Sequence, residues 1–180
     1  MRRIVAGLYV SLDGVVEAPD TWIGPYFNEE IGQTIGSLMA AMDTLLLGRV
    51  TYEGFAGAFA GQTGAIADQM NNRPKVVVST TLKKADWQNS TLINVDVAAG
   101  ITQLKQQPGK NIGISGSATL VRWLLRAGLL DELNLLVFPI VLGSGKRLFG
   151  DVTGQMPLKL VDSRAFDTGV VQLVYEPAGK

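Results

Sequence analysis

Small polar residues follow three apolar segments of this chain, and their types and spacing suit the binding of an anion. The segments read TLLLGRVT, KVVVSTT and NIGISGSAT, so each apolar run stops at glycine, serine or threonine. Ser115-Gly116-Ser117 leads at once into a helix-like pattern, whose free N–H groups and dipole would attract an anion. Gly116 would let a phosphate approach without a Cβ in its way, and the guanidinium of Arg49 suits phosphate geometry.

Each of these segments also has a simpler interpretation. A Gly/Ser turn between a strand and a helix is commonly only a connection with an N-cap. Ser79-Thr80-Thr81 alone can be a turn, and Arg49 alone can be a solvated or paired charge. The argument for a nucleotide site therefore rests on three such ends in one sheet. Neither the GxGxxG fingerprint nor a Walker A sequence is present.

Alternating strands and helices are expected to position these residues. We expect strands at residues 2–10, 44–49, 75–80, 91–96, 111–115 and 131–142, with a terminal hairpin formed by 158–166 and 170–177. We expect helices after a cap at Asn28 and at 63–71, 97–107 and 117–127. This order predicts an α/β fold with a mostly parallel central sheet, helices on both faces and a C-terminal antiparallel hairpin. Ligands of such sheets bind beyond the carboxyl ends of the strands.

The composition excludes several kinds of chemistry. The 180 residues fit a single domain, 1–180, and contain no cysteine and no histidine. A thiol nucleophile, a Ser-His-Asp triad and a Cys/His zinc site are therefore excluded, and we expect no metal. Acid–base work falls to Asp, Glu, Lys, Tyr or water, so a cofactor is expected to carry the harder chemistry.

The charge and hydropathy patterns bear on partners and location. The formal net charge is zero, so nothing indicates capture of nucleic acid or of an anionic membrane. No stretch approaches the ~18–20 apolar residues of a membrane span. We expect a cytoplasmic protein that acts on a small molecule.

Five stretches of the chain, in order, resemble the C-terminal reductase domain of the riboflavin-biosynthesis deaminase–reductase and its dihydrofolate-reductase-like relatives. They read YVSLDGVVEAPDTW, DTLLLGRVTYEGF, KVVVSTTL, GISGSATLVRWLLRAGLLDEL and FPIVLGSGKRLF. The resemblance implies a dihydrofolate-reductase-like three-layer fold that binds NADPH. The implied contacts to the cofactor come from Gly48, Arg49, Val50 and Thr51 at the pyrophosphate and adenosine, from Ser79, Thr80 and Thr81 along the ribose, and from Ser115, Gly116, Ser117, Ala118 and Thr119 at a second phosphate cradle.

The substrate side departs from the relatives. Dihydrofolate reductases place a carboxylate in the helix after the first loop, and here Gly32 or Gln33 stands at that position, so reduction of dihydrofolate is not favoured. The candidate catalytic acids are Asp13, on a loop that would shield the nicotinamide, and Glu29. The candidate substrate-binding residues are Trp22, Tyr52, Phe55 and Lys146. Simpler interpretations are a turn for Asp13, core positions for the aromatic residues and an exposed loop charge for Lys146.

The sequence therefore predicts an NADPH-dependent reductase that transfers hydride to a small heterocycle or a phosphoribosylamino-pyrimidine-like compound. One alternative is a non-catalytic nucleotide-binding module of the same fold. Another is a true riboflavin-pathway reductase acting without a deaminase domain. The long apolar stretch 131–142 would be a liability at an open sheet edge. Together with the habit of the family, it suggests a homodimer.

Overall fold

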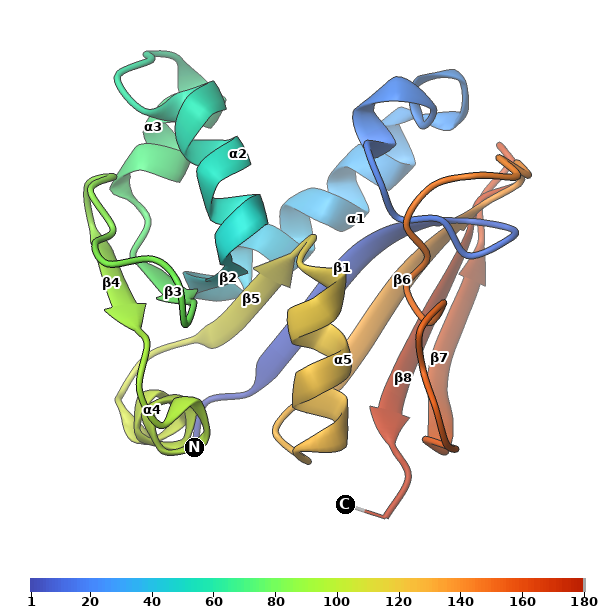
Figure 1. The fold of residues 1–180 in the computed structure, drawn as a ribbon. Coiled ribbons are helices and arrows are strands. Elements are labelled where there is room, and N and C mark those ends of the chain that lie inside the picture. Colours follow the sequence, from blue (N-terminus) through green and yellow to red (C-terminus); the bar gives the residue numbers. More distant parts are fainter. Residues whose placement is uncertain (180) are drawn as a thin grey trace.

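Five α-helices and eight strands make up the computed structural model, which describes residues 1–179 (Figure 1). The strands are β1 Ile4–Ser11, β2 Met42–Gly48, β3 Lys75–Val78, β4 Ser90–Ile93, β5 Asn111–Ser115, β6 Glu132–Phe138, β7 Leu158–Ala165 and β8 Val171–Pro177. The helices are α1 Glu29–Ala40, α2 Arg49–Phe59, α3 Ala65–Asn72, α4 Val97–Gln106 and α5 Ala118–Arg126.

All eight strands belong to one sheet, in the order β4-β3-β2-β5-β1-β6-β8-β7. The pairs from β4 to β6 are parallel, and β8 and β7 add an antiparallel hairpin. Helices α1, α2 and α3 cover one face, whereas α4 and α5 cover the other. The predicted fold class, a dihydrofolate-reductase-like three-layer α/β fold, is confirmed.

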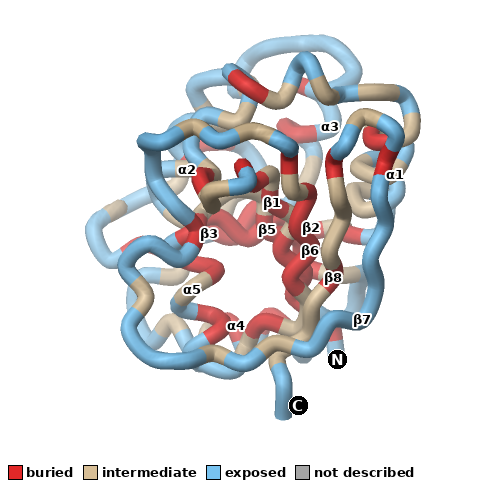
Figure 2. Tube along the Cα trace, turned by 90° about the vertical axis from the view of Figure 1, so that its right-hand side faces the viewer, coloured by how far each residue is buried: buried red, intermediate tan, exposed pale blue. Residues whose placement is uncertain are grey.

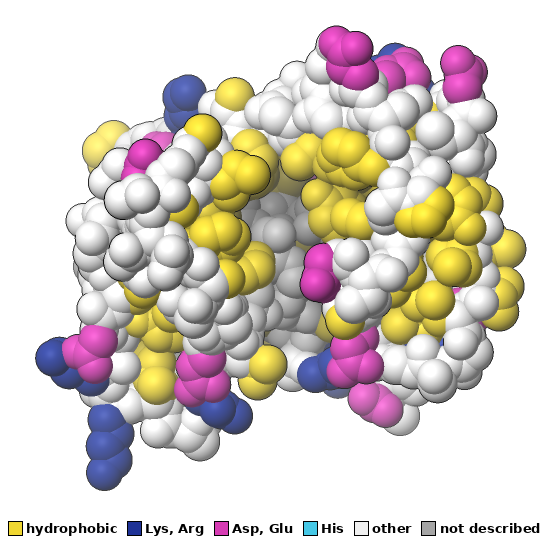
Figure 3. Space-filling view, turned by 90° about the horizontal axis from the view of Figure 1, so that it is seen from above, with side chains coloured by type: hydrophobic (Ala, Val, Ile, Leu, Met, Phe, Trp, Pro, Cys, Tyr) yellow, Lys and Arg dark blue, Asp and Glu magenta, His cyan; other side chains and the backbone are white. Residues whose placement is uncertain are grey.

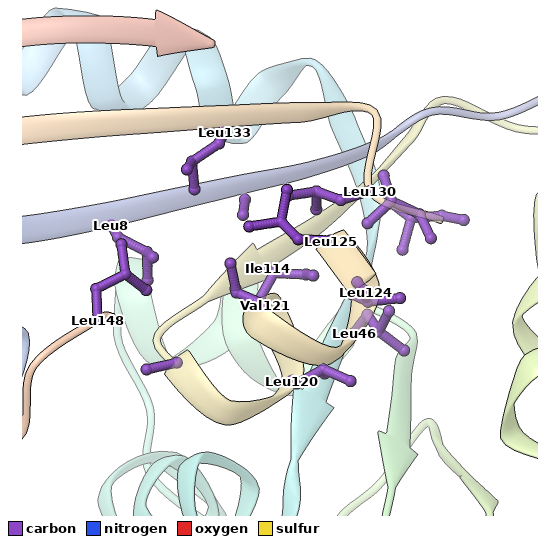
Figure 4. Close-up of a cluster of buried hydrophobic side chains, with 14 of the residues drawn as sticks. Leu8, Leu46, Ile114, Leu120, Val121, Leu124, Leu125, Leu130, Leu133 and Leu148 are labelled. Atoms are coloured by element: carbon purple, nitrogen blue, oxygen red, sulfur yellow. The ribbon is translucent and has the colours of Figure 1, made fainter. Parts of the chain in front are cut away.

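The largest hydrophobic core lies between the sheet and helices α4 and α5 (Figure 4). Helix α5 buries one side of its length against the sheet, through Leu120, Val121 and Leu124 among others. Burying each such side chain is worth about 1.5–3 kcal/mol. The buried segments in Figure 2 concentrate on the central strands. This core fixes where β5 ends and α5 begins, which is where the phosphate site was predicted.

The opposite face contains a buried ammonium group. The Nζ atom of Lys75 donates to the carbonyl oxygens of Met70 at 2.8 Å, Asn71 at 3.2 Å and Arg73 at 2.7 Å, at the end of α3. It also lies 4.1 Å from the ring centroid of Trp87. Burial lowers the pKa of Lys75 to about 8. The lysine thus satisfies the last carbonyls of α3, as cations at helix C-termini do.

Some boundaries differ from the prediction. Helix α1 stops at Ala40 and Met42 opens β2, although Met42 fits the apolar period of the helix. Helix α2 is not among the helices that the residue pattern predicted. Its sequence has a low helix propensity, because it contains Gly54, Gly57 and β-branched residues. Among residues 1–179, no helix has both the length and the apolar character to cross a membrane.

The stretch expected as a long strand, 131–142, is corrected by the structure. The strand ends at Phe138, before Pro139, and it lies between β1 and β8 rather than at an edge. Its apolar length therefore reflects burial on both faces and gives no reason for a dimer. The open edge on that side is β7, whose residues are almost all exposed.

Two glycines on the α1 face of the central strands have opposite surroundings. A Cβ built on Gly113 would lie 1.9 Å from the sulfur of Met42, whereas one built on Gly7 meets nothing within 4 Å. We expect Gly113→Ala to destabilise the fold by about 1 kcal/mol, the low end for overpacking, because the flexible end of Met42 can move aside. Gly7→Ala is the matched control and should be neutral or stabilising by up to ~1 kcal/mol. Urea unfolding measures both, and equal stabilities would contradict the packing described.

Candidate active site

The starts of helices α2 and α5 are joined by hydroxyl groups at the carboxyl ends of β2 and β5. The backbone N–H and the Oγ of Ser117 both donate to Thr51 Oγ1, at 3.0 and 2.8 Å. Ser117 Oγ in turn accepts from the backbone N–H of Gly48 at 2.9 Å. Because β2 and β5 pair in parallel, the two helices leave the same edge of the sheet, one to each face.

The turn between β5 and α5 requires an unusual backbone. Gly116 has a φ of 71° and Ser117 has a φ of 56°. The left-handed region costs a non-glycine residue roughly 1–2 kcal/mol. A Cβ on Gly116 would also come within 3.2 Å of Thr51 Cγ2. The bonds to Thr51 therefore hold Ser117 in a strained conformation, and glycine is needed beside it.

The first N–H groups of α2 and α5 receive no side-chain cap within residues 1–179. By contrast, α1 and α4 are capped by the side chains of Asn28 and Asp96. Helix α3 also begins without a cap, so an uncapped start alone would not mark a site. Among the helices of residues 1–179, only α2 and α5 combine uncapped starts with a shared turn. Two convergent helix N-termini provide the donors and the positive potential that a pyrophosphate requires.

The predicted cofactor residues around this turn fall into two groups. Gly48, Ser115 and Gly116 form the turn. Arg49 lies nearby with its side chain about half exposed, and its Nη1 pairs with Glu53 at 3.0 Å. Ser79 instead folds its own turn, because its Oγ accepts from the backbone N–H groups of Thr81 and Leu82 at 3.2 and 2.9 Å. The residues beside it, Thr80 and Thr81, are exposed. In the first turns of the helices Val50 and Thr119 are exposed, whereas Ala118 is buried.

A pocket lies between α1 and the sheet, next to this turn. The end of the molecule that is uppermost in Figure 1 is hollowed, with hydrophobic side chains on both walls (Figure 3). Residues from β1, α1, β2, β5 and β6 line the pocket: Gly7, Leu8, Tyr9, Ile35, Leu38, Met39, Met42, Ile114, Ser115, Asn134 and Leu136. Ser115 belongs to both the pocket and the turn, so the two regions are continuous.

The polar groups of the pocket are uncharged. The sequence analysis missed Tyr9, Asn134 and Gln172, the last of which bonds to Asn134. Burial raises the pKa of the Tyr9 phenol, so it stays protonated at neutral pH. A signal was present in the sequence, because Gly7 and Asn134 each interrupt an otherwise apolar strand.

Asp13 lies where two loops meet and not in the pocket. Its Oδ1 accepts from Ser11 Oγ at 2.7 Å and from the Leu142 N–H at 3.1 Å. Its Oδ2 accepts from the Gly143 N–H at 2.9 Å and faces Arg147 at 3.4 Å. These bonds hold the pKa of Asp13 well below its ordinary value. A carboxylate so occupied acts as a structural acceptor and makes a poor proton donor.

The loop after β1 is also fixed by backbone pairing. Val15 forms an antiparallel bridge with Arg147, and the Val16 N–H donates to the Lys146 carbonyl at 2.9 Å. The Lys146 N–H donates to Glu17 at 3.2 Å. These contacts join residues 11–17 to residues 139–148 in a clasp, and the backbone of Lys146 is part of it. Trp22 is buried beside Phe138, with ring centroids 5.6 Å apart.

The other predicted substrate residues lie outside the pocket. Tyr52 is buried, and its Oη accepts from the Trp87 N–H at 2.8 Å. Phe55 packs in the same cluster under α2. Glu29 is exposed at the start of α1, where its Oε1 accepts from Gln33 at 3.1 Å. Of the two residues expected at the carboxylate position of the dihydrofolate reductases, Gly32 lies against the ring of Phe27, and the side-chain amide of Gln33 donates to Glu29.

The fold is that of a dihydrofolate-reductase-like α/β protein. The chain belongs to the RibD C-terminal domain family, whose sequence profile matches residues 2–172. This finding confirms the resemblance seen in the sequence.

A similar sequence and two solved structures of similar fold accompany this match. The Bacillus subtilis (strain 168) protein YyaP, itself uncharacterized, is 33% identical over 97% of this chain and 94% of its own length. A putative riboflavin biosynthesis protein from Shewanella sp. PV-4 superposes with a TM-score of 0.79 at 22% identity, over 98% of this chain and 99% of its own. Dihydrofolate reductase from Enterococcus faecalis superposes with a TM-score of 0.63 at 14% identity, over 98% of this chain and 96% of its own.

The hydroxyl link between the helix starts gives a direct test. Thr51→Val keeps the shape of the side chain but removes the acceptor for both Ser117 donors. We expect a loss of about 1–3 kcal/mol in the free energy of unfolding, because two donors lose their partner. Thr80→Val, at an exposed position, is the control and should change little. A Thr51→Val protein as stable as its parent in urea would show that the link is not needed.

Asp13 predicts a pH dependence. Its folded pKa lies below the ordinary aspartate value of ~3.9, so its contribution is complete above that value and is lost as the pH falls below it. We expect Asp13→Asn to lower the melting temperature at pH 7 and to flatten the loss of stability below pH ~4. Asp20→Asn, at an exposed position, is the control. Parallel acid profiles for the parent and Asp13→Asn would refute this role.

Proposed function

We propose that this protein is an NADPH-dependent reductase of a small heterocyclic substrate. The observation that supports the proposal most is the position of Ser115, which joins the turn between two uncapped helix starts to the apolar pocket. An extended dinucleotide with its phosphates on the turn would reach the pocket with its nicotinamide. Membership of the RibD C-terminal domain family supports the same activity.

The residues present fit that cofactor. Gly116 supplies the left-handed backbone that the turn needs beside Thr51, and the convergent N–H groups of α2 and α5 supply donors for a phosphate. Arg49, beside the start of α2, supplies a guanidinium for a further phosphate such as the 2′-phosphate of NADPH. When bound, NADPH supplies the hydride, and the protein has to hold the ring and the substrate in the pocket.

The chain's own groups perform the remaining tasks. The clasp between residues 11–17 and 139–148, held by Asp13, fixes the loop that follows β1. The apolar wall of α1 keeps water from the pocket. The described lining includes two hydroxyl groups, from Tyr9 and Ser115. The raised pKa of Tyr9 keeps a proton on its Oη, which can be donated in a hydrogen bond to the substrate.

A non-catalytic nucleotide-binding module is the second candidate, because none of the described lining residues is a carboxylic acid. Tight NADPH binding without oxidation of the cofactor by any of a broad panel of heterocycles would favour it. A true riboflavin-pathway reductase would oxidise NADPH with the phosphoribosylamino-pyrimidine and would lose that activity when Lys146 and Arg147 are neutralised together.

Affinity for the cofactor tests the proposal. We expect Arg49→Ala to weaken NADPH binding by roughly tenfold or more and NADH binding far less, because only NADPH carries the 2′-phosphate. Glu53→Gln is the matched control, since it frees Arg49 from its pair and should leave or improve NADPH affinity. Nicotinamide fluorescence measures all of these constants. No binding of either nucleotide by the parent protein would overturn the proposal.

A further inference from the structure

The pocket is lined by one buried carboxamide, that of Asn134, which is hydrogen-bonded to the half-buried Gln172. Asn134 is 3% exposed and lies on β6, where it accepts at Oδ1 from Gln172 Nε2 of β8 at 3.0 Å. The Asn134 Nδ2 has no protein partner among residues 1–179, and it is not among the atoms sealed from solvent. Because Asn134 lines the pocket, this free amide group faces into it.

The space beside this amide is empty. Asn134 pairs in register with Gly7 on β1, and a Cβ on Gly7 would meet nothing within 4 Å. A side chain at residue 7 would project into the same pocket. The glycine therefore leaves room for a flat group against the sheet, within reach of Asn134.

The wall opposite the sheet carries no charge that could balance an ionic ligand. The side chains of α1 that line the pocket are Ile35, Leu38 and Met39, and the polar lining residues are neutral. Placing an ion here would cost its hydration without a partner in return. The pocket therefore favours a substrate portion that is uncharged.

We propose that the Asn134–Gln172 carboxamide pair recognises the substrate, and that the recognised portion is an uncharged ring with an amide-like edge of adjacent C=O and N–H groups. This inference rests on the proposed function, because it names the substrate class of the same pocket. Each carboxamide offers both a donor and an acceptor. If both amides rotate together, Asn134 presents C=O instead of NH₂, so the pair matches either group of such an edge.

Two rings of the same shape test the proposal. Quinazoline-2,4-dione is uncharged and has the amide edge, whereas quinazoline-2,4-diamine is a base that gains charge by protonation. We expect the dione to bind at least about tenfold more tightly, measured by calorimetry with and without saturating NADP⁺. Equal binding of the two rings, or tighter binding of the diamine, would overturn the proposal.

Variants assign the effect to the pair. Asn134→Leu should weaken dione binding by about tenfold, and far more than it changes NADP⁺ affinity. Asn134→Asp should reverse the preference toward the diamine, because it places a carboxylate in the pocket. Gln172→Leu, at a half-buried position, should also weaken dione binding, whereas Gln69→Leu on the surface of α3 should not. The Gln172→Leu variant still tests the pair if the Asn134 variants fail to fold.

The outcomes separate this inference from the reductase proposal. NADP⁺ binding without binding of the dione would refute the recognition pair and leave the cofactor site intact. Dione binding that depends on Asn134, without any nucleotide binding, would support the pair and refute the reductase. Unchanged dione affinity in both Asn134→Leu and Gln172→Leu would refute the pair outright.

Discussion

The contact on which the site depends is the bond between Thr51 and Ser117. It joins the first turn of α2 to the first turn of α5 across the sheet, and it holds Ser117 in a left-handed conformation. Two helix starts on opposite faces are thereby brought to one turn with their N–H groups uncapped. The large core under α5 and the parallel pairing of β2 with β5 fix the strand ends that this bond connects. Without it, the same strands and helices would make a fold but no convergent site.

Several charged side chains make structural contacts, whereas the polar side chains that line the pocket are neutral. Asp13 with Arg147, and Lys75 with the end of α3, use their charges to hold loops and helix ends. The pocket keeps Tyr9, Ser115 and Asn134 as its polar groups, against an apolar helix wall. None of the described lining residues of the pocket is a carboxylic acid, in agreement with the sequence, in which Gly32 or Gln33 is expected at the carboxylate position of the dihydrofolate reductases. The proposed ligands, a small neutral ring beside a dinucleotide, agree with this neutral pocket.

Much of the architecture could be predicted from the sequence because it depends on local patterns. Apolar runs ending in Gly or Ser marked β2 and β5, and the cap at Asn28 marked α1. For Trp22, Tyr52 and Asp13 the sequence left a structural and a functional role open. It could not decide between them, because each side chain depends on a partner far along the chain: Phe138, Trp87 and the 142–147 loop. The place of Asn134 in the pocket could not be predicted for the same reason, because it depends on Gly7 and Gln172, which are distant in the sequence.

The most direct test of the account follows the backbone amides of the ¹⁵N-labelled protein by NMR during titration with NADP⁺. The account predicts that the amides of Gly48, Gly116, Ser117 and Thr119 shift first and most, together with those of Gly7 and Ser115 in the adjoining pocket. Saturable shifts confined to other surfaces, with the amides of the turn unmoved, would contradict the central claim that this turn is the phosphate-binding site.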